Sequence, residues 1–174
     1  NSLISTNDLN GFYDGFAMEK NLEVEGELSG TLNNLSIKDI HLYHESTSVE
    51  AENILLKNAF SPEKDFVFWG DFPHFSSSYG DIVSLMPEVL GETLPEDLRY
   101  FGLFEGQAEL TYTTRDLLID ADVFTQRGDF ILSGSFYDLP HLTEATYKGK
   151  LDTYQLKVGE MLGLNDLGDI SASL

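Results

Sequence analysis

The sequence contains no cysteine, few basic residues and no long apolar run. The absence of cysteine among 174 residues excludes a disulfide framework, a thiolate nucleophile and a cysteine-based zinc site. Lysine and arginine total 10 against 30 aspartates and glutamates, which gives a formal net charge of −20. A nucleic-acid binder or a polybasic membrane anchor needs a basic face, so both classes are excluded. No apolar run approaches the roughly 20 residues of a membrane-spanning helix.

Motifs of catalysis and metal binding are also missing. The sequence has no H-E-x-x-H, no G-x-S-x-G and no Walker loop. His41 and His44 are three residues apart on an expected strand, so we expect them to point to opposite faces and to share no metal. Asp120 and Asp122 share a face, but no His or Arg neighbours them, which favours a solvated acidic surface over an acid–base pair. We therefore expect no enzyme activity, no catalytic or metal-binding residue and no cofactor.

What the chain does contain is a regular alternation of apolar and polar residues. Hydrophobic residues make up 41% and aromatic residues 12%, which excludes a disordered acidic tail. Between residues 22 and 32 the even positions are apolar or glycine and the odd positions acidic or polar, the pattern of a half-buried strand. Asn33-Asn34 then predicts a tight turn. The phase slips at Ile40 and again at Ile54, and such slips predict β-bulges. Further strands are expected at 66–72, 102–112, 117–124, 130–137 and 145–151.

A helical period interrupts the strands after residue 78. An apolar stripe at helical spacing consists of Ile82, Leu85, Met86, Val89 and Leu90. We expect a serine of 76–78 to cap this helix and Pro87 to end it near Met86. A short turn is expected over 95–99, and a second short helix over 158–162.

Glycines mark an internal repeat of about 80 residues. Gly26 and Gly106 are 80 residues apart and open matching strand segments. The repeat predicts two units, residues 22–101 and 102–174, with the start of a third near 168. Because the pattern begins and ends inside a unit, we expect the whole chain to be one fragment of a longer repetitive protein.

The apolar face of such a sheet must be covered. The sheet can pack on itself around a closed core, or it can curve into an open groove whose apolar interior accepts a ligand. Glycines occupy apolar positions at Gly26, Gly30, Gly106, Gly134 and Gly149. They fit either a cavity or a strongly curved sheet. The expected fold is all-β with short inserted helices, an antiparallel meander curved into an open groove with an apolar interior.

In this fold the apolar side chains that alternate with acids line the groove, where they contact acyl chains or a partner strand. The predicted ligand-binding residues are Leu22, Val24, Leu28, Leu32, Phe66, Phe68, Phe72, Phe104, Ala108, Leu110, Phe130, Leu132, Phe136, Tyr147 and Leu151. For any one of them, an ordinary place in the core is the alternative.

Four segments carry a resemblance to a known family. Two are strand openings, VEGELSGTLNNLSI at 24–37 and FEGQAEL at 104–110. Two are passages from strand to helix, FPHFSSSYGDI at 72–82 and YKGKL at 147–151 running into GEMLG at 159–163. From about Leu22 onward the chain resembles the C-terminal region of the TamB family, within the AsmA-like group, particularly members from Bacteroidetes-like bacteria.

The resemblance implies a periplasmic segment of a protein that is anchored in the inner membrane and reaches toward the outer membrane. It implies a β-taco groove that moves phospholipid between the membranes, helps to assemble outer-membrane proteins, or does both. The implied partners are phospholipid acyl chains, strands of outer-membrane proteins, and an outer-membrane barrel that binds through a segment not in this chain. Pairing of two copies through open sheet edges is a further expectation, and the family offers no catalytic residue.

A β-rich carbohydrate-binding or adhesin-like module is the alternative function. In that case Trp69, Phe75 and Tyr79, near a turn, would form an aromatic platform for sugar rings. The two functions differ in where they need aromatic side chains, on a solvated surface for sugars and on the apolar face for lipids.

Overall fold

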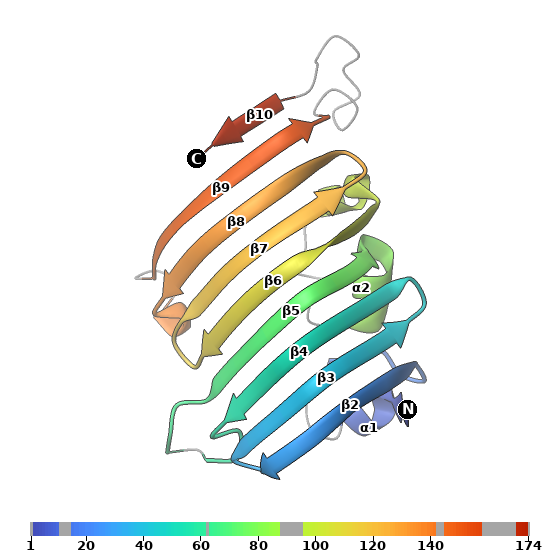
Figure 1. Ribbon diagram of the computed structural model, residues 1–174, viewed down its shortest axis with the longest axis vertical. Helices are drawn as coiled ribbons and strands as arrows, with labels where there is room; N and C mark the ends of the chain where they lie inside the picture. Colours follow the sequence, from blue (N-terminus) through green and yellow to red (C-terminus); the bar gives the residue numbers. More distant parts are fainter. Residues whose placement is uncertain are drawn as a thin grey trace.

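The computed structural model describes residues 2–10, 15–61, 63–87, 96–141, 145–157 and 170–173. These residues form one ten-stranded antiparallel sheet in strict chain order, from β1 at one edge to β10 at the other (Figure 1). The two edges do not pair with each other, so the sheet is open. An all-β antiparallel meander with short helices is thus confirmed.

The strands are β1 (Ser2–Ser5), β2 (Asn21–Thr31), β3 (Asn34–His44), β4 (Thr47–Lys57), β5 (Val67–Ser78), β6 (Leu103–Thr113), β7 (Leu117–Thr125), β8 (Gly128–Tyr137), β9 (Thr146–Leu156) and β10 (Ile170–Ser173). The helices are α1 (Thr6–Leu9), α2 (Tyr79–Leu85) and two 3₁₀ turns, η1 (Glu96–Phe101) and η2 (Leu139–His141). The predicted unit 22–101 contains β2 to β5 with α2 and η1, and the unit 102–174 contains β6 to β10 with η2.

The local signals in the sequence placed most of these elements. Ser78 caps α2 by accepting a hydrogen bond from the Asp81 N–H, and the helix ends at Leu85, before Pro87, as predicted. The turn after β2 lies at 32–33, one residue earlier than predicted. Leu32 is therefore in the turn and not on the strand. Val89, Leu90 and the predicted helix at 158–162 fall outside the described residues, and β1 and α1 were not predicted.

The phase slips in the sequence have a common structural origin. The register shifts between β2 and β3, and again between β5 and β6, whereas β3, β4 and β5 stay in register with one another. Each of these three strands thus carries one extra residue at the same level, near Asp39, Glu52 and Pro73. Asp39 has a positive φ of 50°, and a proline, which lacks an N–H, is tolerated at a bulge. The predicted bulge at Ile40 is confirmed. The extra residue before Ile54 in β4 causes no register shift with β3 or β5, because each of those strands carries an extra residue at the same level.

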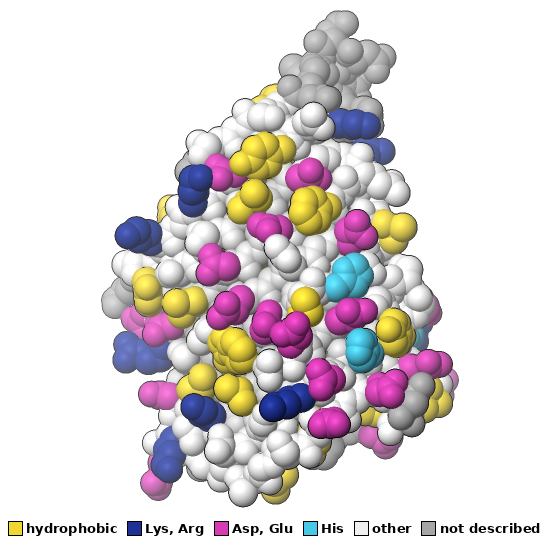
Figure 2. Space-filling model, viewed as in Figure 1, with side chains coloured by type: hydrophobic (Ala, Val, Ile, Leu, Met, Phe, Trp, Pro, Cys, Tyr) yellow, Lys and Arg dark blue, Asp and Glu magenta, His cyan; other side chains and the backbone are white. Residues whose placement is uncertain are grey.

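The sheet has an apolar face and an acidic face. Cross-strand partners point to the same side, and the registers place Phe72, Ala108, Ala121, Leu132 and Leu151 in one row across β5 to β9. On the opposite side, Asp71, Glu109 and Asp120 lie side by side on β5, β6 and β7. Figure 2 shows this acidic face, with carboxylates gathered over the middle of the sheet.

Helices cover one end of the apolar face. In Figure 1, α1, α2 and η1 lie behind the sheet, at the end where β5 stops and β6 starts. We call this the helical end, and the opposite side of the sheet the open end. At the helical end the Phe101 ring packs edge-on against Phe130 at 5.1 Å, and the Ala17 N–H bonds to the Leu85 carbonyl.

The core is thin. Among the described residues only three apolar side chains are buried, Leu22, Ala51 and Ala121. The accessible surface is 11264 Å², whereas a compact globular monomer of 19.5 kDa exposes about 8,500 Å². The extra surface is what a single-layer sheet produces, because one layer cannot bury both of its faces.

Phenylalanine rings lie across the glycines of the apolar face. A Cβ added at Gly70 would lie 2.6 Å from Cε2 of Phe72, and one at Gly106 would lie 2.9 Å from Cζ of Phe75. At Gly134 the ring of Phe136 would be 3.2 Å away. At these positions the glycines do not open a cavity; they let aromatic rings lie flat against the strands.

We predict that Gly106→Ala lowers the melting temperature because the new methyl group clashes with the Asp122 carbonyl oxygen on β7 and with the Phe75 ring. Overpacking of this kind costs about 1–3 kcal/mol. The matched control is Gly80→Ala in α2, where an added Cβ meets only Ser78 Oγ at 3.8 Å. Thermal unfolding followed by circular dichroism should show a loss for the first variant and no loss for the second. Equal melting temperatures would contradict the close approach of the β7 backbone and the Phe75 ring to Gly106.

Candidate functional site

The apolar face brings together nearly all of the predicted lining residues. Thirteen of the fifteen lie on this face of β2, β5, β6, β8 and β9. Phe66 lies just before β5, with its ring 6.2 Å from that of Tyr112. Leu32 is the exception, since it lies in the β2–β3 turn and is 71% exposed.

The predicted set missed further members of the same face. Tyr112, Leu117, Ile119 and Val123 belong to the apolar rows of β6 and β7. The alternation of apolar and polar residues in the sequence already indicated that these four side chains lie on the apolar face. The third slip, from Phe72 to Phe75, was also visible as the same three-residue step that occurs at Ile37–Ile40 and Ala51–Ile54.

The open end of the apolar face is the most exposed part of this surface. Tyr147 is 82% exposed, Leu28 69% and Tyr112 40%. No described helix or strand packs over these side chains. An apolar surface of this kind is typical of a binding site, because apolar groups gain free energy when another molecule covers them.

A shallow hollow of about 470 Å³ lies at the open end, between β8 and β9. Leu132, Phe136, Tyr147 and Leu151 form its apolar part. Lys148 and Lys150 also line it. Strand alternation points their side chains to the acidic face, where the Lys150 ammonium pairs with Asp152. The hollow therefore offers an apolar surface, which suits an acyl chain.

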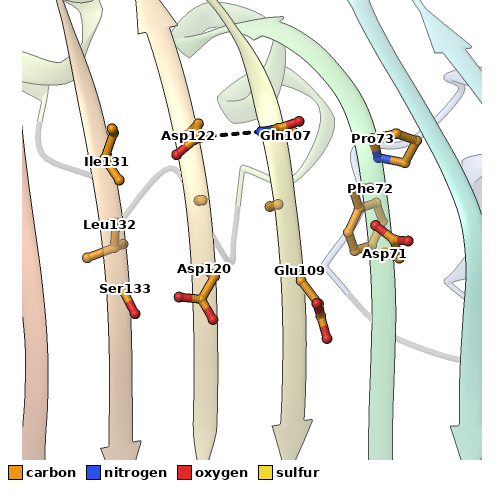
Figure 3. A pocket seen from close by; sticks show the side chains of 12 residues that line it. Asp71, Phe72, Pro73, Gln107, Glu109, Asp120, Asp122, Ile131, Leu132 and Ser133 are labelled. Atoms are coloured by element: carbon orange, nitrogen blue, oxygen red, sulfur yellow. Dashed lines mark hydrogen bonds between the residues drawn. The ribbon is translucent and has the colours of Figure 1, made fainter.

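The acidic face has a hollow of its own, of about 360 Å³, next to the β5 bulge (Figure 3). Asp71, Glu109, Asp120 and Asp122 reach it from three neighbouring strands. The Gln107 amide donates a 2.8 Å hydrogen bond to Asp122. Over the described part of the chain, no group of three or more acidic or histidine side chains could hold a metal ion. This hollow offers a polar, solvated surface without the geometry of a metal centre.

The predicted aromatic platform is not assembled. Trp69 and Phe75 are six residues apart, and plain alternation would put them on one face. The extra residue of the β5 bulge moves them to opposite faces. The Trp69 indole N–H donates to Glu109 at 2.9 Å on the acidic face, whereas the Phe75 ring packs 6.4 Å from Phe104 on the apolar face. The two rings therefore cannot stack on one sugar.

The two histidines also lie on opposite faces, as predicted. His41 is on the acidic face, with Nδ1 3.9 Å from a Glu50 carboxylate oxygen. His44 is buried at the helical end, and its Nδ1 lies 2.8 Å from the Asn21 carbonyl oxygen. They cannot bind a common ligand.

Two ion pairs shift carboxyl pKa values. The Lys150 ammonium lies 2.5 Å from Asp152 on β9, where it lowers the pKa of that carboxyl, and the Ser173 hydrogen bond adds to the effect. The same contact raises the pKa of Lys150. The pKa of Asp138, at the turn after β8, is lowered by a hydrogen bond with His141 and by Arg115. Each pair stabilises the fold above the ordinary aspartate pKa, and this contribution is lost as the pH falls through the lowered value.

We predict that Lys150→Met raises the pKa of Asp152 toward its ordinary value of 3.8, since the main cause of the shift is removed. A carboxyl titration followed by NMR measures this directly. The Asp138 pKa serves as the internal control and should stay low in the variant. An unchanged Asp152 pKa would show that the ion pair does not form in solution.

Among the described residues, no helix is long and apolar enough to cross a membrane. No family model matches the sequence, and no curated protein or solved structure matches the chain.

Proposed function

We propose that this chain is a non-enzymatic, periplasmic segment of a TamB-like envelope protein. Its apolar face would serve as a groove for phospholipid acyl chains that move between the two membranes. The same surface would also receive strands of outer-membrane proteins during their assembly. The resemblance of 24–37 and 104–110 to that family gives the proposal its biological setting.

The observation that carries the proposal is a continuous apolar face on a single-layer sheet. Apolar rows cross all the strands from β5 to β9 at two levels, Phe68 to Tyr147 and Phe72 to Leu151. At a spacing of about 4.8 Å per strand, ten strands make a surface about 43 Å long. No described second sheet packs on it, so the surface is open to elongated apolar ligands.

The charge distribution limits how a lipid would bind. With a net charge of −20, the chain repels anionic headgroups, and most carboxylates of the sheet lie on the face opposite the rings. Acyl chains would therefore lie on the apolar face with their headgroups in water.

A carbohydrate-binding function has less support. It needs aromatic rings gathered on one solvated surface, and Trp69 and Phe75 lie on opposite faces. The aromatic rings that do gather, such as Phe68 and Phe72 at 6.4 Å, belong to the apolar face.

Native mass spectrometry of the purified chain incubated with phospholipid tests the lipid function. We predict bound phospholipid with the natural sequence and at least a tenfold loss of binding in Tyr112→Asp. The matched control is Leu118→Asp. Both side chains are 40% exposed and lie at the same level of neighbouring strands, but Tyr112 is on the apolar face and Leu118 on the acidic face.

Circular dichroism of both variants should show the unchanged sheet. Equal lipid binding by the two variants, or no lipid bound by the natural chain, would overturn the proposal. In the second case a scaffold that acts through protein contacts alone would be the better assignment.

A further inference from the structure

One row of side chains on the acidic face crosses the sheet from β2 to β9. The registers place the following residues directly opposite one another, in strand order: Glu23, Tyr43, Ser48, Ser76, Glu105, Phe124, Asp129 and Tyr154. We call these eight residues the cross-strand row. It runs at the helical end, where β1 pairs with β2 and β10 pairs with β9. Both ends of the row therefore lie where the strand has a partner on each side.

The three aromatic rings of the cross-strand row are exposed to solvent. Tyr43 is 46% exposed, Phe124 47% and Tyr154 46%. Figure 2 shows hydrophobic side chains standing between carboxylates over the upper half of this face. Exposed rings cost free energy in water and release it when another molecule covers them. The row is therefore a surface on which a partner gains affinity.

Each ring of the row has a carboxylate as its direct cross-strand neighbour. Phe124 lies between Glu105 on β6 and Asp129 on β8, and Asp129 is also opposite Tyr154. At the other end of the row, the ring on β3 lies opposite a glutamate of β2. The Cβ atoms of such neighbours are about 4.5–5.5 Å apart. In the described part of the chain, neither Glu105 nor Asp129 takes part in an ion pair.

An aromatic ring beside an unpaired carboxylate is a combination that recognises a guanidinium group. The planar cation stacks on the face of the ring, and its N–H groups donate to the neighbouring carboxylate. A lysine ammonium is a point charge without this planar fork. The net charge of −20 attracts a basic partner and repels an acidic one. The chemistry of the row thus favours a partner that presents arginine side chains.

A hollow of about 460 Å³ lies next to Phe124 on the same row. Ser76 and Glu105 line it, together with Leu103, which is 52% exposed. The hollow therefore gives room for an apolar side chain of the partner beside its arginines.

The spacing of the rings fits a helix that lies across the strands. Phe124 and Tyr154 are two strands apart, which is about 9.6 Å at about 4.8 Å per strand. Residues seven positions apart lie on the same face of a helix, about 10.5 Å apart. One helix can therefore place an arginine on each of these two rings.

A sugar fits the row less well than a basic helix. Asp129 separates the rings of Phe124 and Tyr154, so the two rings form no continuous platform. A neutral glycan also brings no cation to the unpaired carboxylates.

We propose that the cross-strand row binds an arginine-bearing helix of a partner protein, which lies across the strands at the helical end of the acidic face. The rings of Phe124 and Tyr154 stack on guanidinium groups, and Glu105 and Asp129 pair with them. The apolar face on the other side of the sheet stays free. This proposal therefore does not depend on the lipid-carrying function.

Fluorescence anisotropy with labelled, alanine-based helical peptides tests the proposal. One peptide carries two arginines seven positions apart, and the control peptide carries citrulline, which is neutral and has nearly the same shape, at both positions. The arginine peptide should bind, and the citrulline peptide should bind about tenfold more weakly because it loses both the charge and the cation–π contact. Equal binding of the two peptides, or no binding of either, would overturn the proposal.

Two matched pairs of variants place the binding on the row. Phe124→Ser should weaken binding of the arginine peptide about fivefold, whereas Leu118→Ser should not, although Leu118 is an exposed residue on the same face of the same strand. Glu105→Gln should also weaken binding, whereas Glu27→Gln makes the same change of charge on β2 and should not. Circular dichroism should show the unchanged sheet in all four variants. Equal losses within either pair would contradict the assignment to this row.

Isothermal titration with maltohexaose tests the competing class of ligand. We expect no heat of binding from this neutral glycan. Binding of maltohexaose that Phe124→Ser abolishes and Leu118→Ser preserves would assign the row to a sugar and overturn the proposal.

Discussion

The constraint on which this structure depends is that a single layer of β-sheet cannot bury both of its faces. Alternation places carboxylates on one side and aliphatic and aromatic groups on the other. Only the carboxylate side is well solvated by water. α1, α2 and η1 cover the part of the apolar face that lies at the helical end. Away from the helices, aromatic rings such as Phe72 over Gly70 and Phe136 close to Gly134 cover only part of the backbone. The exposed remainder is the feature that the functional assignment rests on.

The two faces perform different tasks because their free-energy contributions differ. The acidic face is solvated, and its exposed ion pairs contribute little to stability. Its negative field keeps a flat, edge-rich sheet in solution and discourages unspecific pairing of edges. The apolar face supplies the free energy for binding, since each covered square ångström contributes about 25 cal/mol. Affinity for apolar ligands and solubility are thus separated onto opposite sides of the same strands.

The sequence alone predicted most strands and their faces because alternation is a local signal. Thirteen of the fifteen lining residues lie on the predicted face for that reason. The prediction failed where the structure depends on distant partners. Leu32 falls into a turn set by the pairing of β2 with β3. Trp69 and Phe75 separate because β5 shares a bulge with β3 and β4. The rings over Gly70 and Gly106 depend on side-chain rotamers, which no spacing rule reveals.

The bulge shared by β3, β4 and β5 also restricts how such a chain can change its length. Deleting the extra residue from one of these strands alone would shift half of that strand by one position and exchange its apolar and acidic sides. The residues near Asp39, Glu52 and Pro73 can therefore be gained or lost only as a group of three. Over evolutionary time a segment of this kind should change length by whole units of four strands more readily than by single residues.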